Sequence, residues 1–166
     1  MYEVREASVS DAGIIRQLAY DTWPSAYGNI LSDEQISYML KLFYSEPSLL
    51  HQMQAQLHRF LILYRDGQPV GFASFSPKAG GPHGLFRLHK LYVLPSEQGK
   101  GGGKKLMDGL FQIIKASSAT AIECNVNRFN PAKLFYERLG FRVEREEDID
   151  IGNGYWMNDY VMRKDV

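Results

Sequence analysis

A glycine-rich turn at residues 98–105, Gln-Gly-Lys-Gly-Gly-Gly-Lys-Lys, constrains the fold of this chain more than any other segment. It follows an apolar extended run at residues 88–94 and precedes a segment of helical periodicity that begins at Leu106. The pattern predicts a strand, a turn and a helix in direct succession. Such a turn presents unpaired backbone N–H groups at the positive end of a helix dipole, so we expect it to bind a phosphorylated ligand. The alternative interpretation is an ordinary flexible loop with solvated charges.

The glycine spacing excludes two common nucleotide-binding loops. A Walker loop requires glycine where Gln98 stands and Ser or Thr where Lys105 stands. A dinucleotide-binding loop fails at its last glycine, which would fall on Lys104 or Leu106. What remains is the pattern Gln-x-x-Gly-x-Gly at residues 98–103, with lysines adding local positive charge.

Size and composition predict one domain over residues 1–166, because 45% hydrophobic content in 166 residues is enough for a substantial core. Lys plus Arg and Asp plus Glu both number 19, so we expect neither nucleic acid nor a membrane surface as a partner. The single cysteine, Cys124, permits no internal disulfide, lies in an apolar run and is interpreted as a buried strand residue. With no signal-peptide core and no long apolar run, the sequence predicts a cytoplasmic protein without a membrane span.

Hydrophobic periodicity divides the chain into alternating strands and helices. The predicted strands are residues 2–6, 59–64, 70–75, 85–93, 121–126, 142–150 and 155–163. Predicted helices begin at Ser10, Ser32, Pro47, Leu106 and Asn130, and the first of them is expected to break at Trp23-Pro24. This order indicates a mixed sheet that is covered by helices on both faces.

Two segments together resemble the GCN5-related N-acetyltransferase (GNAT) family. Residues 91–103, Leu-Tyr-Val-Leu-Pro-Ser-Glu-Gln-Gly-Lys-Gly-Gly-Gly, are similar to its acetyl-CoA-binding motif. Residues 125–141, Asn-Val-Asn-Arg-Phe-Asn-Pro-Ala-Lys-Leu-Phe-Tyr-Glu-Arg-Leu-Gly-Phe, resemble its second motif. Residues 152–162, 23–27 and 32–53 resemble, more loosely, the spermidine/spermine-type branch.

The resemblance implies a single-domain α/β fold of the GNAT type. Its sheet would be mixed but mostly antiparallel, with about seven strands, a splay between the fourth and fifth strands, and helices on both faces. Residues 1–84 would form mainly the substrate side, residues 85–141 the acetyl-CoA-binding core and residues 142–166 a C-terminal hairpin. A homodimer is a further expectation from the family.

The resemblance also implies acetyl-CoA as co-substrate and no metal. The turn would wrap the CoA pyrophosphate, the fourth strand would pair with the pantetheine arm, and a backbone amide near Val93 would polarise the thioester carbonyl. The residues expected at the cofactor are Leu91, Tyr92, Val93, Gln98, Gly99, Lys100, Gly101, Gly102, Gly103, Lys104, Asn125, Asn130, Phe135 and Tyr136.

The implied activity is direct transfer of the acetyl group to a primary amine of a small molecule, for which a polyamine is one candidate. Tyr136 matches the family's general acid, since a phenol is protonated at neutral pH. His89 or Glu123 could be the general base, although a structural role remains the alternative for each. Alternatives to this activity are a non-catalytic acyl-CoA-binding or sensor domain and an enzyme that acetylates a protein amine. Residues that could contact the acceptor are Trp23, Tyr27, Asp33, Glu34, Tyr38, Tyr44, Asp148, Asp150, Tyr155 and Trp156.

Overall fold

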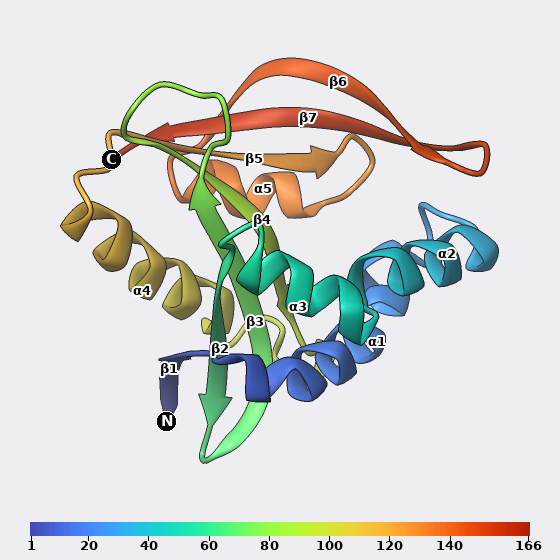
Figure 1. Cartoon of the computed structure of the whole chain (residues 1–166), viewed down its shortest axis with the longest axis horizontal. Helices are drawn as coiled ribbons and strands as arrows, with labels where there is room; N and C mark the ends of the chain where they lie inside the picture. Colours follow the sequence, from blue (N-terminus) through green and yellow to red (C-terminus); the bar gives the residue numbers. More distant parts are fainter.

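One seven-stranded sheet runs through the molecule, and helices lie on both of its faces (Figure 1). The computed structural model describes all residues from 1 to 166. The strands are β1 (Tyr2–Glu6), β2 (Arg59–Arg65), β3 (Gln68–Pro77), β4 (Leu85–Val93), β5 (Ala121–Asn127), β6 (Arg142–Gly152) and β7 (Tyr155–Asp165). The helices are α1 (Ala12–Tyr27), α2 (Asp33–Tyr44), α3 (Glu46–Gln54), α4 (Gly102–Ala116) and α5 (Ala132–Arg138), with short 3₁₀ turns η1 (Val9–Asp11) and η2 (Pro95–Glu97).

The strand order, β1-β2-β3-β4-β5-β7-β6, contains one parallel pair, β4 with β5, and all the other pairs are antiparallel. The β4–β5 pairing begins at Leu85 opposite Ala121 and ends at Leu88 opposite Cys124. Beyond Leu88 the two strands continue without pairing to each other, so they diverge in the middle of the sheet. The predicted mixed sheet with a splay between its fourth and fifth strands is confirmed.

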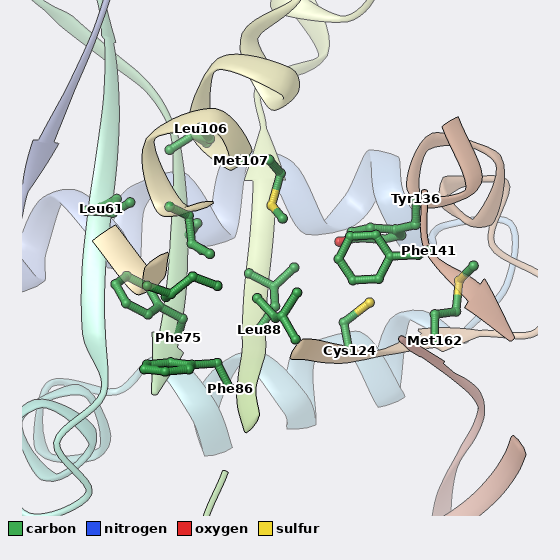
Figure 2. Packing of buried hydrophobic residues seen from close by; sticks show 14 of the residues in the cluster. Leu61, Phe75, Phe86, Leu88, Leu106, Met107, Cys124, Tyr136, Phe141 and Met162 are labelled. Carbon is green, nitrogen blue, oxygen red and sulfur yellow. The ribbon is translucent and has the colours of Figure 1, made fainter. Parts of the chain in front are cut away.

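Two hydrophobic clusters fill the opposite faces of the sheet. Alternation along β2 sends Leu61 and Leu63 into the cluster beneath α4 and α5, and Phe60 and Ile62 into the cluster beneath α1, α2 and α3. Figure 2 shows the first cluster, in which Met107 of α4, Tyr136 of α5 and Cys124 of β5 approach one another. Cys124 is buried and unpaired, in agreement with the expected core position.

The break predicted at Trp23-Pro24 is wrong, because α1 continues through Pro24 to Tyr27. Proline removes one backbone donor from the helix interior, but packing offsets that loss. Trp23 is 3% exposed, and its ring centroid lies 4.6 Å from that of Tyr27 and 5.8 Å from that of Tyr44. The Gly28 N–H still donates to the Pro24 carbonyl at 2.9 Å, so the last turn stays helical.

Two predicted helix starts move by a few residues. Helix α4 begins at Gly102 instead of Leu106, so the last glycines of the turn form its first helical turn. Helix α5 begins at Ala132, and the Asn130 Oδ1 atom accepts a hydrogen bond from the Ala132 N–H at 2.9 Å. The helix starts two residues after the predicted Asn130, and its N-cap position is Pro131 instead of Asn130. The Asn130 side chain orders the turn that leads into the helix.

Candidate active site

The glycine turn leaves β4 through η2 and enters α4 at Gly101. The first bond inside α4 joins the Lys105 N–H to the Gly101 carbonyl at 3.0 Å. No hydrogen-bond partner is found for the N–H groups that precede it, which belong to Gly99, Gly101, Gly102, Gly103 and Lys104. Unpaired N–H groups at a helix start attract an anion, and Lys100 and Lys104 add exposed positive charge beside them.

Backbone geometry accounts for glycine at two positions of this turn. Gly101 has φ +84° and ψ +8°, a left-handed conformation that costs other residues about 1–2 kcal/mol. A Cβ atom on Gly103 would lie 3.2 Å from the ring of Phe135, so absence of a side chain lets α5 approach the start of α4. The two predicted motifs are therefore in contact through Gly103 and Phe135.

A small pocket opens where β4 and β5 diverge. It is lined by residues of both strands together with side chains from α1 and α5. The predicted cofactor residues among the lining are Leu91, Tyr92, Asn125, Asn130 and Tyr136. Val93 lies at the end of β4, where the Gln98 Nε2 atom donates to its carbonyl at 3.3 Å. Gln98 thus ties the turn to the strand that borders the pocket.

Tyr136 extends from α5 into this pocket and is 8% exposed. Its ring packs at an angle of 70° against Phe141 and 78° against Phe135, and Figure 2 shows it beside Phe141. Burial raises the pKa of the Tyr136 hydroxyl well above its ordinary value. The hydroxyl therefore stays protonated at neutral pH and makes no hydrogen bond within the protein, so it is free to donate to a ligand.

A pair of tyrosine hydroxyls closes the α1 side of the pocket. Tyr27 of α1 and Tyr92 of β4 share a hydrogen bond of 2.7 Å. Burial raises the pKa of Tyr27 to about 12 and that of Tyr92 well above its ordinary value, so both remain neutral. Tyr92 points away from Leu91, which packs on the α4 side of the sheet.

A buried carboxylate lies behind the pocket on β7. Asp159 is 1% exposed, and its Oδ2 atom accepts a hydrogen bond from Asn125 Nδ2 at 3.2 Å. Its side chain makes no ion pair, and burial is the main cause that raises its pKa. The Oδ1 atom of Asn125 is also buried without a partner. The sequence analysis missed Asp159, although Met157 and Val161, which flank it at the alternate positions of β7, mark this face as inward.

His89, one predicted base, stands at the irregular point of the β3–β4 pairing. Its Nε2 atom is 2.8 Å from Ser76 Oγ, and its ring stacks on His58 with centroids 3.8 Å apart. Burial, followed by the nearby charges, lowers the pKa of His89 to about 2. A group with this pKa has little affinity for a proton at neutral pH.

Glu123, the other predicted base, is 2% exposed and does not line the pocket. Lys78 contacts its Oε1 atom, and a guanidinium nitrogen of Arg87 and one of Arg145 each lie 3.7 Å from that atom. This arrangement compensates the buried charge of Glu123 within the protein.

Lys90 of β4 is a further charged residue that the sequence analysis did not single out. Its Nζ atom donates to Gln52 Oε1 at 2.5 Å and lies 5.6 Å and 5.5 Å from the ring centroids of Tyr44 and Phe60. Burial lowers the pKa of Lys90 to about 7. No carboxylate forms an ion pair with it. No cluster of three or more His, Cys, Asp or Glu side chains is arranged to hold a metal ion.

The fold is defined by a seven-stranded sheet whose central strands β4 and β5 diverge beside the unpaired N–H groups at the start of α4. Residues 56–143 match the family model described as the acetyltransferase (GNAT) domain. The chain is 28% identical to the spermidine N(1)-acetyltransferase of Thermoplasma acidophilum, in an alignment that covers 89% of this chain and 92% of that protein. It is 26% identical to an uncharacterized N-acetyltransferase of Bacillus subtilis, over 91% of this chain and 86% of that protein.

Solved structures show the same fold along the whole chain. A paia N-acetyltransferase from Thermoplasma acidophilum, crystallised in complex with coenzyme A, superposes with a TM-score of 0.82 and 27% identity. The alignment covers 100% of this chain and 99% of that one. A GCN5-related N-acetyltransferase structure from Rhodopseudomonas palustris gives a TM-score of 0.83 at 23% identity, with 99% and 95% coverage.

The chain belongs to the GNAT family of acetyltransferases. It is an N-acetyltransferase that uses acetyl-CoA as its acetyl donor. None of its helices is both long and apolar enough to cross a membrane.

Proposed function

We propose that the turn at residues 98–104 holds the pyrophosphate of acetyl-CoA and that the unpaired edge of β4 carries its pantetheine arm. The unpaired N–H groups at the start of α4 are the observation that supports this most directly. They stand at the open end of the β4–β5 splay, where the backbone of β4 beyond Leu88 has no partner on that side. When bound there, acetyl-CoA supplies a thioester as the activated acetyl group.

Tyr136 is the general acid in this proposal. Its hydroxyl is neutral, unpaired and directed into the pocket, so it can give a proton to the departing sulfur. Asn130, which precedes α5, and Asn125 of β5 border the pocket and would contact the arm of the cofactor. Phe135 of α5 would contact it from beside Gly103 of the turn. The cofactor-binding core is then residues 85–141, as the sequence predicts.

The acceptor in this proposal is a primary amine of a small molecule, in the polyamine class. Support comes from the similarity to a spermidine N(1)-acetyltransferase. A second, open hollow lies between α2 and the β6–β7 turn, lined by Asp33 and Glu34 beside the ring pair Tyr38 and Tyr155, with Lys41 at its side. Carboxylates and aromatic faces together suit a distant ammonium group of an extended amine. Residues 1–84 and the hairpin of residues 142–166 would then form the substrate side.

A thiol-release assay with acetyl-CoA tests this proposal. The acceptor panel contains spermidine, spermine, shorter diamines, amino acids and a peptide with a free N-terminus. We expect the wild type to release CoA with the polyamines, and the Tyr136→Phe variant to lose about 100-fold to 10,000-fold in kcat, the range typical of a general acid.

Two further measurements make the result specific. Isothermal titration should give the same acetyl-CoA affinity for Tyr136→Phe and the wild type, because the phenyl ring still fills its place in the core. Tyr20→Phe, a matched change on α1 beside Arg16, should keep full activity. Release of CoA with the peptide alone would contradict the small-molecule acceptor, and an unchanged kcat for Tyr136→Phe would contradict the role of the phenol.

A further inference from the structure

We propose that Asp159 is the proton acceptor for the amine substrate, an inference that rests on the proposed amine acetylation. Neither residue considered from the sequence is as well suited to this task. His89 is hydrogen-bonded to Ser76, and Glu123 is surrounded by Lys78, Arg87 and Arg145. Asp159 is a buried carboxylate near the splay that forms no ion pair.

The hydrogen bonding around Asp159 leaves room for a cationic donor. One carboxylate oxygen accepts from Asn125, and the other has no protein donor. The free Oδ1 of Asn125 adds a second unpaired acceptor beside it. A buried anion without a partner is costly to keep, whereas a primary ammonium brings three N–H donors and a positive charge to the same place.

Asp159 does not line the pocket itself but lies directly behind Asn125 and Asn127, which do. Asp159 pairs with Asn127 across the β5–β7 ladder, so both side chains stand on the same face of the sheet as Asn125. The next residues along β5, Cys124 and Val126, point to the opposite face, with Tyr136. The proton acceptor and the proton donor therefore lie on opposite sides of the layer that the thioester would occupy.

The proton transfers balance in this arrangement. An N–H bond of the ammonium breaks, its proton passes to the Asp159 carboxylate directly or through one water, and the freed electron pair attacks the thioester carbonyl. The C–S bond breaks, and sulfur takes the Tyr136 proton. Tyr136 recovers a proton from the nitrogen of the new amide, and Asp159 returns its proton to water. The products are one amide, one CoA thiol and one released proton.

The charged and titratable groups around Asp159 come from every element packed against it. They are Tyr27 of α1, Arg87 of β4, Cys124 of β5, Arg128 after β5 and Glu147 of β6. The two arginines favour the charged carboxylate and Glu147 opposes it, while burial favours the neutral acid. On balance the pKa of Asp159 is raised, so its carboxylate takes up a proton more readily than that of an exposed aspartate.

The test compares Asp159→Asn with the wild type and with Asp165→Asn, which removes an exposed carboxylate from the same strand. With an amine that the wild type acetylates, we expect Asp159→Asn to lose about 100-fold or more in kcat/KM at pH 7. The acetyl-CoA dissociation constant should change less than twofold, and Asp165→Asn should match the wild type. Asp159→Glu should regain part of the activity, because it restores a carboxylate.

A pH profile separates proton transfer from a structural role. Without the acceptor, the remaining rate should rise with pH as the amine itself deprotonates, so the gap between Asp159→Asn and wild type should narrow toward pH 10. Asp159→Asn should also unfold at the same temperature as the wild type or a higher one, since a buried charge is removed. Activity within threefold of the wild type overturns the inference, as does a pH-independent loss with a lower unfolding temperature. Absence of turnover by the wild type with every amine instead contradicts the proposed acceptor class, and this inference with it.

Discussion

Adding one methyl group at Gly101 tests whether the glycine turn binds the pyrophosphate of acetyl-CoA. Gly101 has φ +84°, and a Cβ atom there would meet no protein atom within 4 Å. Gly67, in the turn between β2 and β3, has φ +83° and equally open surroundings. Gly101→Ala and Gly67→Ala therefore impose the same backbone strain at two places, of which one is the proposed binding loop.

The expected stability effect is the same for both variants. The left-handed conformation costs an alanine about 1–2 kcal/mol, and the loss of unfolded-state freedom returns about 0.4–1 kcal/mol. The net free energy of unfolding should fall by about 1 kcal/mol, which lowers the unfolding temperature by about 2–4 °C in a chain of this size. Urea unfolding with a fluorescence readout measures this change.

Only Gly101→Ala should weaken the binding of acetyl-CoA. Its methyl group would stand among the unpaired N–H groups where the pyrophosphate must approach, so we expect the dissociation constant to rise at least tenfold, equivalent to about 1.4 kcal/mol. Isothermal titration should give an unchanged constant for Gly67→Ala. Equal affinities for the two variants would refute the assignment of the pyrophosphate to this turn.

Two further predictions concern buried ionisable groups. Lys90→Met should raise the free energy of unfolding at pH 6, because it removes a charged ammonium that is costly to bury. The shift of the Lys90 pKa from 10.5 to about 7 sets this cost at no more than about 5 kcal/mol, and we expect a gain of about 2 kcal/mol because the residue is partly buried. Above pH 7 the folded protein loses the Lys90 proton, whereas the unfolded chain keeps it up to pH 10.5, so wild-type stability rises between pH 7 and pH 10.5. The gain in stability from Lys90→Met should therefore shrink over this range, and equal gains at pH 6 and pH 9 in urea unfolding would contradict this. The pKa of His58 is lowered to about 4, mainly by burial, and the unfolded chain binds more protons below about pH 6.5. Stability should therefore decrease as pH falls from 6.5 toward 4, and His58→Phe should flatten that decrease; parallel curves for the two proteins would disprove this cause.

Much of the fold could be predicted because local patterns and the family motifs agree. The glycine turn between a strand and a helix, the Asp66-Gly67 hairpin and Asn130 before α5 each carry their own conformational signal. The helix break predicted at Pro24 is wrong because the local preference of proline is outweighed by the packing of Trp23, which depends on residues distant in sequence. Local propensity yields to tertiary contacts in such cases.

The residues of the candidate site also fall into two groups, those that the sequence could predict and those that it could not. Tyr136 and the glycines lie within contiguous motifs, so their neighbours in sequence are also their neighbours in space. Asp159 and Lys90 owe their character to burial by other elements, which no local pattern records. The cations that surround Glu123 likewise come from three different strands or loops, so its ion pairs could not be predicted from the residues next to it in sequence.

The short β4–β5 pairing also bears on how the molecule unfolds. Strands β1 to β4 form one antiparallel ribbon and β5, β7 and β6 form another, and the two ribbons are joined by the few pairs between Leu85 and Leu88 of β4 and Ala121 and Cys124 of β5. Such a seam is the natural boundary between two cooperative units. A molecule bound along the seam contacts both ribbons and couples their openings, so acetyl-CoA should sharpen the unfolding transition in addition to moving its midpoint. Acetyl-CoA bound between β4 and β5 would thus also contribute to the stability of the whole fold.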